Sequence, residues 1–558
     1  MSMKTKNQFA ALQVRGRFTH VLEIYVNNTM LEVDKMLEKC GDFNRQQLIM
    51  LLLSALISLL SAMLNISYSI IYTVPKHWCA DGLGSGPPPP NADECKPFYT
   101  NSSTSDTCKN YSYESYMGYQ SFVSEMNWIC DKAWKMKLGN NIARAGCAIG
   151  NLVMGYLADR LGRVPILVFA NVMTISDNFL TIFGISLELF CVVQFITGFV
   201  VISNFSIIRI LIVEYMRPSL RTVCLNISYG FFFCLGMIIS PWIAILTGSW
   251  RRFMLLQALP IIVVPFFFYF VPESVQWLIS RQKYDEAIES LRRVAKTNGR
   301  QIDDSVYEEF IEDCKLSQQN TKTNPNLLHL FRMPRLRRTL LILLFEYFVF
   351  SFYISIITYR LSGVEISRFV IISLSATALL PSSLAAIVLQ DRIGRKTLAF
   401  TIVILMCIFI LVSGVVFSTA ANRSARTLFT CYVIGMFFHS LAVNSNTQYT
   451  LELLPACIRG QALGALFTMD LASLIWANCI FDMRKIFILL PEIILGVLTL
   501  LVAGLILLLP ETLDRTLPSS LQDGEQLGID EHWYTFRCME KRTQPEELDS
   551  PLAPQNSI

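Results

Sequence analysis

Long apolar runs alternate with polar segments along the 558 residues of the chain. A run of about 20 apolar residues can cross the hydrocarbon core of a bilayer as a helix. Twelve such runs occur, and a charged segment separates the first six from the last six. They predict spans at about 48–73, 136–158, 164–184, 187–213, 220–245, 252–271, 338–358, 367–390, 397–419, 427–449, 461–482 and 487–509. The pattern therefore predicts an all-α integral membrane protein with twelve transmembrane helices.

The polar segments divide this chain into five parts. We expect an N-terminal tail at 1–47, a six-helix bundle at 48–271 with a long loop at 74–135, a linker with helical segments at 272–337, a second six-helix bundle at 338–509 and a C-terminal tail at 510–558. Lys and Arg are frequent in the N-terminal tail and the linker, and cytoplasmic segments of membrane proteins carry an excess of both. Both termini and the linker are therefore expected in the cytoplasm, and the loop outside.

The loop at 74–135 has the composition of an extracellular segment. Its GLGSGPPPP stretch forbids a continuous helix. An even number of cysteines beside glycosylation sequons is typical of a disulfide-linked, glycosylated loop. The candidates are Cys79, Cys95, Cys108 and Cys130 for disulfides, and Asn101 and Asn110 for glycans. Three pairings of the cysteines are open, and free thiols with unused sequons are the alternative.

A short motif is repeated in the two halves of the chain. GYLADRLGR at 155–163 follows the second predicted span, and LQDRIGRK at 389–396 follows the eighth. Parallel repeats of this kind are typical of transporters built from two bundles around a central site. An acidic residue there can meet helix N-termini and arginines, so the motif is a candidate gate. Its members are Gly155, Asp159, Arg160, Gly162 and Arg163, then Asp391, Arg392, Gly394 and Arg395. Alternatively, the basic residues only fix the topology.

Composition narrows the classes of function. Apolar residues make up 53% of the chain and charged residues 16%, against roughly 25% charged in soluble domains. The net charge of +4 gives no reason to expect a nucleic-acid partner. The sequence contains no metalloprotease, nucleotide-binding, serine-hydrolase or CxxC motif. We therefore expect a lipid-embedded protein that is not an enzyme and uses no cofactor or metal.

Further segments resemble one transporter family. They are FVSEMNWICDKAWK at 122–135, LRTV at 220–223, VPESVQWLISRQKYDEAI at 271–288, LFRMPRLRRTLLIL at 330–343, ELLPACIRG at 452–460 and LLLPETL at 507–513. With the long loop after the first span, they resemble the organic cation, organic anion and carnitine transporters of the major facilitator superfamily. Val275 and Gln276 depart from the family, which usually has Pro and Arg there. The resemblance implies a major facilitator fold of two six-helix bundles, a plasma-membrane location and transport of a small organic ion by alternating access.

Ionisable residues inside predicted spans are expensive in a bilayer and are candidates for function. By the resemblance, Phe205 and Tyr353 match aromatic pocket residues, while Arg209 and Glu346 replace aromatic ones. Asp470 falls one residue before the position that selects substrate charge. The candidate binding residues are Arg144, Phe205, Arg209, Glu346, Phe350, Tyr353, Asn444 and Asp470. Asp177 has no role that the resemblance supplies.

The mixed charges suggest the substrate. Arg144 and Arg209 lie in the first half of the chain, and Glu346 and Asp470 in the second. A small amino-acid-like zwitterion, such as a β-amino acid or a carnitine-like compound, could bridge the halves. An organic cation is the alternative, followed by an organic anion or a sensor that binds solute without moving it. Structural pairing of the buried Arg with the buried acids is the competing explanation.

Overall fold

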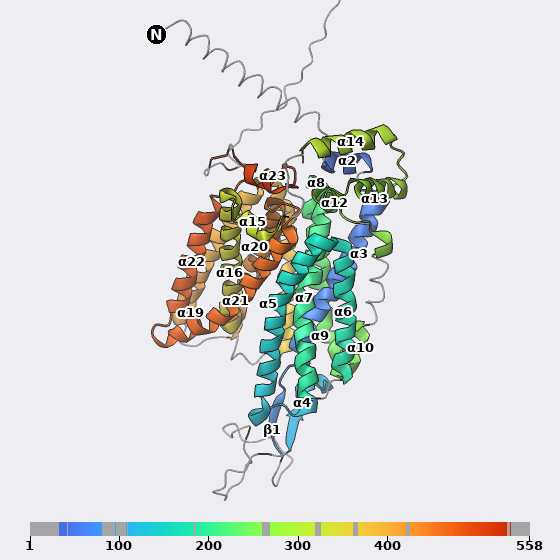
Figure 1. Ribbon diagram of the computed structural model, residues 1–558. Helices are drawn as coiled ribbons and strands as arrows, with labels where there is room; N and C mark the ends of the chain where they lie inside the picture. Colours follow the sequence, from blue (N-terminus) through green and yellow to red (C-terminus); the bar gives the residue numbers. More distant parts are fainter. Residues whose placement is uncertain are drawn as a thin grey trace, which may run out of the picture.

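The computed structural model describes residues 33–258 apart from 42, 81–94, 96–107, 109 and 184–185. It also describes 268–529 apart from 318–324, 361–366 and 420–424, together with residues 531, 532 and 536. Most of the described residues are helical, and the helices form two elongated bundles that lie side by side (Figure 1). This arrangement agrees with the two helical bundles that the sequence predicts.

Eight helices in the described residues are long and apolar enough to cross a membrane. Each coincides with one of the predicted spans. Two of the eight are interrupted: one is the continuous unit of α8 (Pro218–Leu225), η3 (Asn226–Phe233) and α9 (Cys234–Thr247), and the other is the unit of α17 (Arg368–Thr377) and α18 (Leu379–Ile393). The other six are the single helices α3 (Arg45–Ile71), α6 (Arg163–Phe183), α7 (Leu187–Tyr215), α16 (Pro334–Arg360), α19 (Arg395–Thr419) and α20 (Ala425–Leu453).

Four further helices occupy the remaining predicted places. They are α5 (Trp134–Leu161), α10 (Trp250–Ala258), α21 (Arg459–Asp482) and α22 (Leu490–Ile506). Polar residues such as Asn140, Asn141 and Arg144 lower the mean hydropathy of α5. The described part of α10 stops at Ala258, and α22 is an apolar helix of 17 residues. The twelve predicted spans thus correspond to helices of the two bundles.

One transmembrane unit contains a widened turn. The residues of η3 (Asn226–Phe233) form π-helix between α8 and α9. Such turns occur often at functional sites, because the extra residue per turn changes which side chains share a face. Here Tyr229 and Phe233 both point into the cavity described below.

The linker and two short helices cover one end of the bundles (Figure 1). They are α2 (Val33–Lys39), α12 (Val275–Ser280), α13 (Tyr284–Thr297), α14 (Asp304–Ser317), α15 (Leu327–Leu330) and α23 (Leu521–Gln526). Asp34 of α2 accepts two hydrogen bonds from the Arg221 guanidinium, at 2.8 and 3.0 Å, which fixes α2 to the start of α8. We call the end that carries α12, α13 and α14 the linker end.

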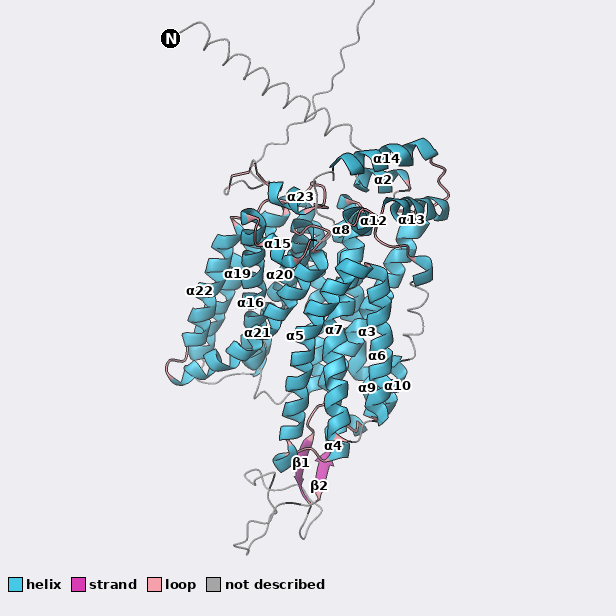
Figure 2. Cartoon of the chain, viewed as in Figure 1, coloured by secondary structure: helices cyan, strands magenta, loops and turns pink. Residues whose placement is uncertain are grey.

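The opposite end carries the loop at 74–135, and we call it the loop end. The loop contains α4 (Phe122–Met126) and a small antiparallel sheet, the only strands in the described residues: β1 (Lys76–Cys79) and β2 (Tyr111–Glu114), with Lys76 opposite Glu114 (Figure 2). This sheet adds to the all-helical fold expected from the sequence. Asn110 is exposed beside this sheet, whereas Asn101 lies outside the described residues.

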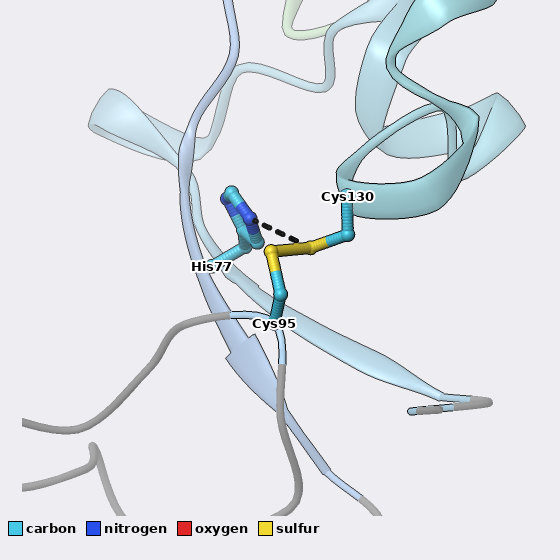
Figure 3. A group of neighbouring side chains, drawn as sticks. All are labelled: His77, Cys95 and Cys130. Atoms are coloured by element: carbon cyan, nitrogen blue, oxygen red, sulfur yellow. Dashed lines mark hydrogen bonds between the residues drawn. A yellow bond between two sulfur atoms is a disulfide. The ribbon is translucent and has the colours of Figure 1, made fainter. Parts of the chain in front are cut away.

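Two disulfides hold the loop, and they resolve the choice that the sequence left open. Cys79 pairs with Cys108, and Cys95 pairs with Cys130. His77 lies beside the second disulfide, with its Nε2 atom 3.7 Å from the Cys130 Sγ atom (Figure 3). The three side chains are close enough to ligate a metal, but metal ligation by cysteine uses the thiolate. Both sulfur atoms are bonded to each other in the disulfide, so this cluster stabilises the loop and does not bind a metal through thiolates.

The loop contacts both bundles. Glu125 of α4 accepts a hydrogen bond of 2.6 Å from Arg251 of α10, which ties the loop to the N-terminal bundle. On the other side, the Phe369 ring of α17 stacks on Tyr116 and meets Tyr119 edge-on, with ring centroids 5.3 and 5.5 Å apart. The loop is therefore a physical connection between the two bundles at the loop end.

Candidate functional site

A cavity of about 410 Å³ lies between the two bundles. Both bundles contribute to its wall, which is mostly apolar and contains six Phe and Tyr side chains. The lining residues are Asn65, Ile66, Ile202, Phe205, Arg209, Tyr229, Phe233, Met237, Tyr347, Phe350, Ser351, Ile354, Leu379, Met436, His439, Ser440, Val443, Asn446, Thr447, Phe467 and Asp470. A largely apolar wall with few polar groups is the usual character of a site for a small organic molecule.

Arg209 of α7 provides the positive charge of the cavity. Its guanidinium lies between the rings of Phe205 and Tyr229, with the Cζ atom 3.7 Å from each ring centroid. Nη1 donates to Thr447 Oγ1 at 3.0 Å, and Nη2 has no hydrogen-bond partner among the described residues. No described carboxylate pairs with Arg209. The side chain is thus held in place by aromatic rings, while part of its hydrogen-bonding capacity stays free.

Acidic side chains lie on the C-terminal side of the cavity. Asp470 of α21 lines it, near Ser351 of α16. Glu346 of α16 is fully buried behind Asn446, whose side-chain amide donates a hydrogen bond to Glu346 Oε1. Glu346 Oε2 has no partner among the described residues. The acids and Arg209 therefore belong to different bundles, and the structural pairing considered for them is not present.

Four of the eight candidate binding residues line the cavity, namely Phe205, Arg209, Phe350 and Asp470. Two others lie one layer behind it. Glu346 supports Asn446, and the buried Tyr353 ring is parallel to that of His439, with centroids 6.1 Å apart. Glu346 and Tyr353 belong to α16, whereas Asn446 and His439 belong to α20 and line the cavity. Glu346 and Tyr353 therefore act on the cavity through a neighbour.

The other two candidates lie elsewhere. Asn444 donates a hydrogen bond of 2.9 Å to Ser383 Oγ and so faces α18. Arg144 is exposed on α5 and does not line the cavity. Sequence reasoning also missed lining residues, above all Tyr229, Phe233 and Phe467. The first two were recognisable as an i, i+4 pair in the ISYGFFF run, but their aromatic neighbours made that run look like ordinary lipid-facing sequence.

The first repeat motif joins the two bundles at the linker end. The Asp159 carboxylate at the end of α5 accepts hydrogen bonds from the backbone N–H groups of Gly460 and Gln461, at 3.0 and 2.8 Å, and from the Gln461 side chain at 3.2 Å. Those N–H groups belong to the first turn of α21, which needs acceptors. Asp159 also forms an ion pair of 3.2 Å with Arg163. One carboxylate thus caps a helix of the other bundle.

A buried glutamate adds a second connection beside Asp159. The Glu214 carboxylate of α7 lies 3.4 Å from Arg163 and 2.5 Å from Arg459, and all three side chains are fully buried. Arg163 also donates a hydrogen bond of 2.7 Å to the Ala456 carbonyl oxygen. Because Arg459 and Ala456 belong to the C-terminal half, these contacts hold the linker end closed.

The second repeat motif makes the corresponding contact from the other half. Asp391 Oδ1 accepts hydrogen bonds from Thr222 Oγ1 of α8 at 2.7 Å and from Arg395 at 2.8 Å. Arg395 in turn pairs with Glu452 at 3.2 Å. Each motif therefore sends its aspartate to the opposite bundle. Arg392 is exposed and takes no part in these contacts.

The remaining residues of the two motifs shape the turns. Gly162 and Gly394 have φ angles of 115° and 93°, a backbone conformation that side chains rarely adopt. Arg160 is exposed, and its guanidinium lies 4.8 Å from the centroid of the Tyr156 ring. The turn residues thus divide into glycines that allow the tight geometry, charged residues that join the bundles, and arginines that face outward.

Two glutamates outside the motifs complete the turns. Glu273 accepts hydrogen bonds from the backbone N–H groups of Arg163 and Val164, at 3.0 and 3.2 Å. Glu511 does the same for Arg395 and Lys396, at 2.9 and 3.2 Å. Burial raises the pKa of the Glu273 carboxyl, and its hydrogen bonds and Arg163 oppose that rise. These matching caps extend the internal repeat from the motifs to the Pro-Glu-Ser sequence at 272–274 and the Pro-Glu-Thr sequence at 510–512.

Comparisons with known proteins agree with this architecture. The sequence profile of a family described as "Sugar (and other) transporter" matches residues 95–520. "Solute carrier family 22 member 3" from Mus musculus is 28% identical over 411 residues, which cover 74% of this chain and 73% of that protein. "Organic anion transporter 3" from Sus scrofa is 26% identical, with 84% of each chain covered. A structure of the proton:xylose symporter XylE has a TM-score of 0.60 and 18% identity, covering 86% of this chain and 98% of the other.

Proposed function

The chain belongs to the family of sugar and other transporters, and on that premise we propose that it carries a zwitterionic organic solute by alternating access between its two bundles. It is a membrane transporter of the organic-ion type. In our proposal the linker end faces the cytoplasm of a plasma-membrane protein, as the distribution of Lys and Arg indicates. The contacts at the linker end then close the cytoplasmic side of the cavity.

The observation that carries the substrate proposal is that the Arg209 guanidinium has no carboxylate partner among the described residues and that its Nη2 atom has no hydrogen-bond partner there. This guanidinium lies in the cavity wall, and it is therefore ready to bind an anionic group of the solute. Asp470 on the other bundle suits an amine. A solute that carries both groups neutralises both charges at once.

The cavity also bears on the size of the solute. A volume of about 410 Å³ falls within the range of roughly 300–1,000 Å³ that is usual for sites of organic ligands. Six aromatic side chains favour a solute with an apolar or aromatic body. Carnitine-sized and larger zwitterions fit this description better than a β-amino acid does.

Bridging by the solute also supports the mechanism. Arg209 lies on α7 and Asp470 on α21, so one bound molecule contacts both bundles. Contacts that form only when the bundles approach lower the free energy of the occluded state relative to the open ones. Empty carrier lacks these contacts and relies on the connections at the linker end.

Competitive uptake with three matched solutes tests this proposal. Each solute shares one apolar body and carries an amine, a carboxylate or both. We expect the zwitterion to compete best. Arg209→Ala should lower kcat/KM for it by about ten- to hundredfold, the effect of losing one charge-assisted hydrogen bond or two. Asp470→Asn should reduce the preference for the zwitterion over the carboxylate solute.

Arg144→Ala is the matched control, because it removes an arginine that does not line the cavity. Its uptake should stay close to that of the wild type. Preferential uptake of the amine solute, unaffected by Arg209→Ala, would support the organic cation alternative. Binding of the zwitterion without flux in proteoliposomes would indicate a sensor.

A further inference from the structure

A second polar cluster lies inside the N-terminal bundle. Its centre is Asp177 of α6, which is 1% exposed. The Oδ2 atom accepts hydrogen bonds from the Tyr68 hydroxyl of α3 at 3.0 Å and from Thr197 Oγ1 of α7 at 2.5 Å. The Oδ1 atom has no hydrogen-bond partner among the described residues.

The charge of Asp177 is not balanced by the protein. No Lys or Arg of the described residues pairs with it; its neighbours are the hydroxyl groups of Tyr68 and Thr197. An ionised carboxylate buried without a counter-charge is strongly unfavourable, especially in a transmembrane bundle. A bound cation or a proton must therefore neutralise it.

A small void adjoins the carboxylate. Its volume is about 10 Å³, which is room for one particle of the size of a water molecule. Six of the nine side chains around it carry oxygen, two from each of three helices. They are Ser61 and Tyr68 of α3, Thr174 and Asp177 of α6, and Thr197 and Asn204 of α7. Carboxylate, hydroxyl and amide oxygens are the ligands that hard metal cations prefer.

We propose that this void is a binding site for one small monovalent metal cation, with Na⁺ as the ion. One carboxylate is the only formal charge in the wall, so a monovalent ion gives a neutral site and a divalent ion an excess of positive charge. A proton would neutralise Asp177 without a void and without five further oxygen-bearing side chains. The available space and the oxygen-rich wall therefore favour the metal ion.

The site lies next to the cavity but shares no lining residue with it. Helix α7 contributes to both, with Asn204 at the void and Phe205 at the cavity. An ion that fixes the position of α7 against α3 and α6 therefore also affects the Phe205–Arg209 wall. If the bound ion changes the affinity for the solute by some factor, the bound solute must change the affinity for the ion by the same factor.

Thermal unfolding of the purified full-length protein tests the proposal without any organic solute. The melting temperature is measured in NaCl and in N-methylglucamine chloride at equal ionic strength, at pH 6 and at pH 7.5. We expect a saturable rise with Na⁺ at both pH values, because a ligand that binds only the folded state stabilises it. Asp177→Asn should abolish the rise. Thr197→Val, which keeps the shape of the side chain, should raise the Na⁺ concentration for half of the effect by about tenfold.

Ser176→Ala is the matched control, since Ser176 is exposed on the same helix and its hydroxyl bonds only the Val172 carbonyl. It should retain the wild-type response. The proposal is overturned by the absence of a Na⁺-specific rise in the wild type, by a response to pH alone, or by a full Na⁺ response in Thr197→Val. The Thr197→Val measurement tests the proposal even if the Asp177→Asn variant does not fold. The result is independent of the zwitterion proposal, because no flux and no solute are measured.

Discussion

Gly155 of α5 and Gly460 of α21 meet backbone to backbone across the two bundles at the linker end. A Cβ atom on Gly155 would lie 2.3 Å from the Gly460 carbonyl oxygen, and one on Gly460 would lie 2.7 Å from the Gly155 carbonyl oxygen. Real Cβ atoms do not approach a backbone oxygen so closely, so neither position accepts a side chain unless the helices move apart. Closure of the linker end thus depends on glycine at both positions.

We expect Gly155→Ala to disfavour the closed linker end. Overpacking of this kind costs about 1–3 kcal/mol, which shifts the equilibrium between the end states by roughly fivefold to over a hundredfold. Uptake per molecule at the surface should fall accordingly. Gly504→Ala in α22 is the control, since its Cβ atom meets nothing within 4 Å. Equal uptake by the two variants would contradict this view.

Asp159→Asn should reduce turnover more than surface abundance. The asparagine side chain has one acceptor oxygen, whereas the carboxylate uses both of its oxygens for the first turn of α21. Each charge-assisted hydrogen bond contributes about 1.5–3 kcal/mol, so the closed state becomes at least about tenfold less populated. Uptake and surface biotinylation measure the two effects.

Arg160→Gln serves as control for Asp159→Asn, because Arg160 is the exposed neighbour in the same turn. It should change neither turnover nor abundance. Loss of Asp159→Asn from the membrane with normal activity per molecule would mean that Asp159 serves folding only.

The aromatic pair around Arg209 gives a prediction about the cavity. Tyr229→Leu removes one of the two rings that hold the guanidinium, so Arg209 should lose its fixed orientation. A cation–π contact in a desolvated place contributes about 2 kcal/mol, which corresponds to roughly a thirtyfold rise in KM for the anionic group of the solute. Tyr229→Phe keeps the ring and should stay near the wild type. A large effect of Tyr229→Phe would instead assign the role to the hydroxyl.

The disulfide pairing in the loop predicts a defined peptide map. Proteolysis without reduction, followed by mass spectrometry, should yield the linked pairs Cys79–Cys108 and Cys95–Cys130. Free thiols should contribute little background, because burial raises the pKa of the Cys40 and Cys457 thiols to about 12. A peptide that links Cys79 to Cys95 would refute the pairing.

The sequence predicts the helices of this protein well, because a transmembrane helix must present a long apolar run. The ends are less predictable. α3 begins at Arg45 and α16 at Pro334, before the apolar runs start, because helices extend into the polar residues that flank them. The break at Ala378 and the π-helical turn at 226–233 also depend on packing between helices, which no local pattern records.

The lining of the cavity was predictable only in part. Where one helix carries several polar residues, the sequence does not indicate which of them faces the cavity. Asn444 and Asn446 are two positions apart, which is a rotation of about 200° on a helix, and only the second faces the cavity. Arg144 belongs to a row of polar residues on one face of α5. The sequence does not indicate whether that face borders the cavity or another part of the protein. By contrast, Asp159 and Asp391 were predictable as a pair, since the internal repeat gives each residue a counterpart.

The ring contacts of Phe369 with Tyr116 and Tyr119 connect the two bundles at the loop end, and we call these contacts the latch. Any motion that separates the bundles there must first pull these rings apart, so the strength of the latch sets how long the loop end stays shut. In the orientation proposed above, the latch faces the extracellular space, where an antibody can reach it. An antibody against the folded loop would therefore change the rate of the carrier without entering the cavity. Inhibition of this kind would not be relieved by raising the concentration of solute.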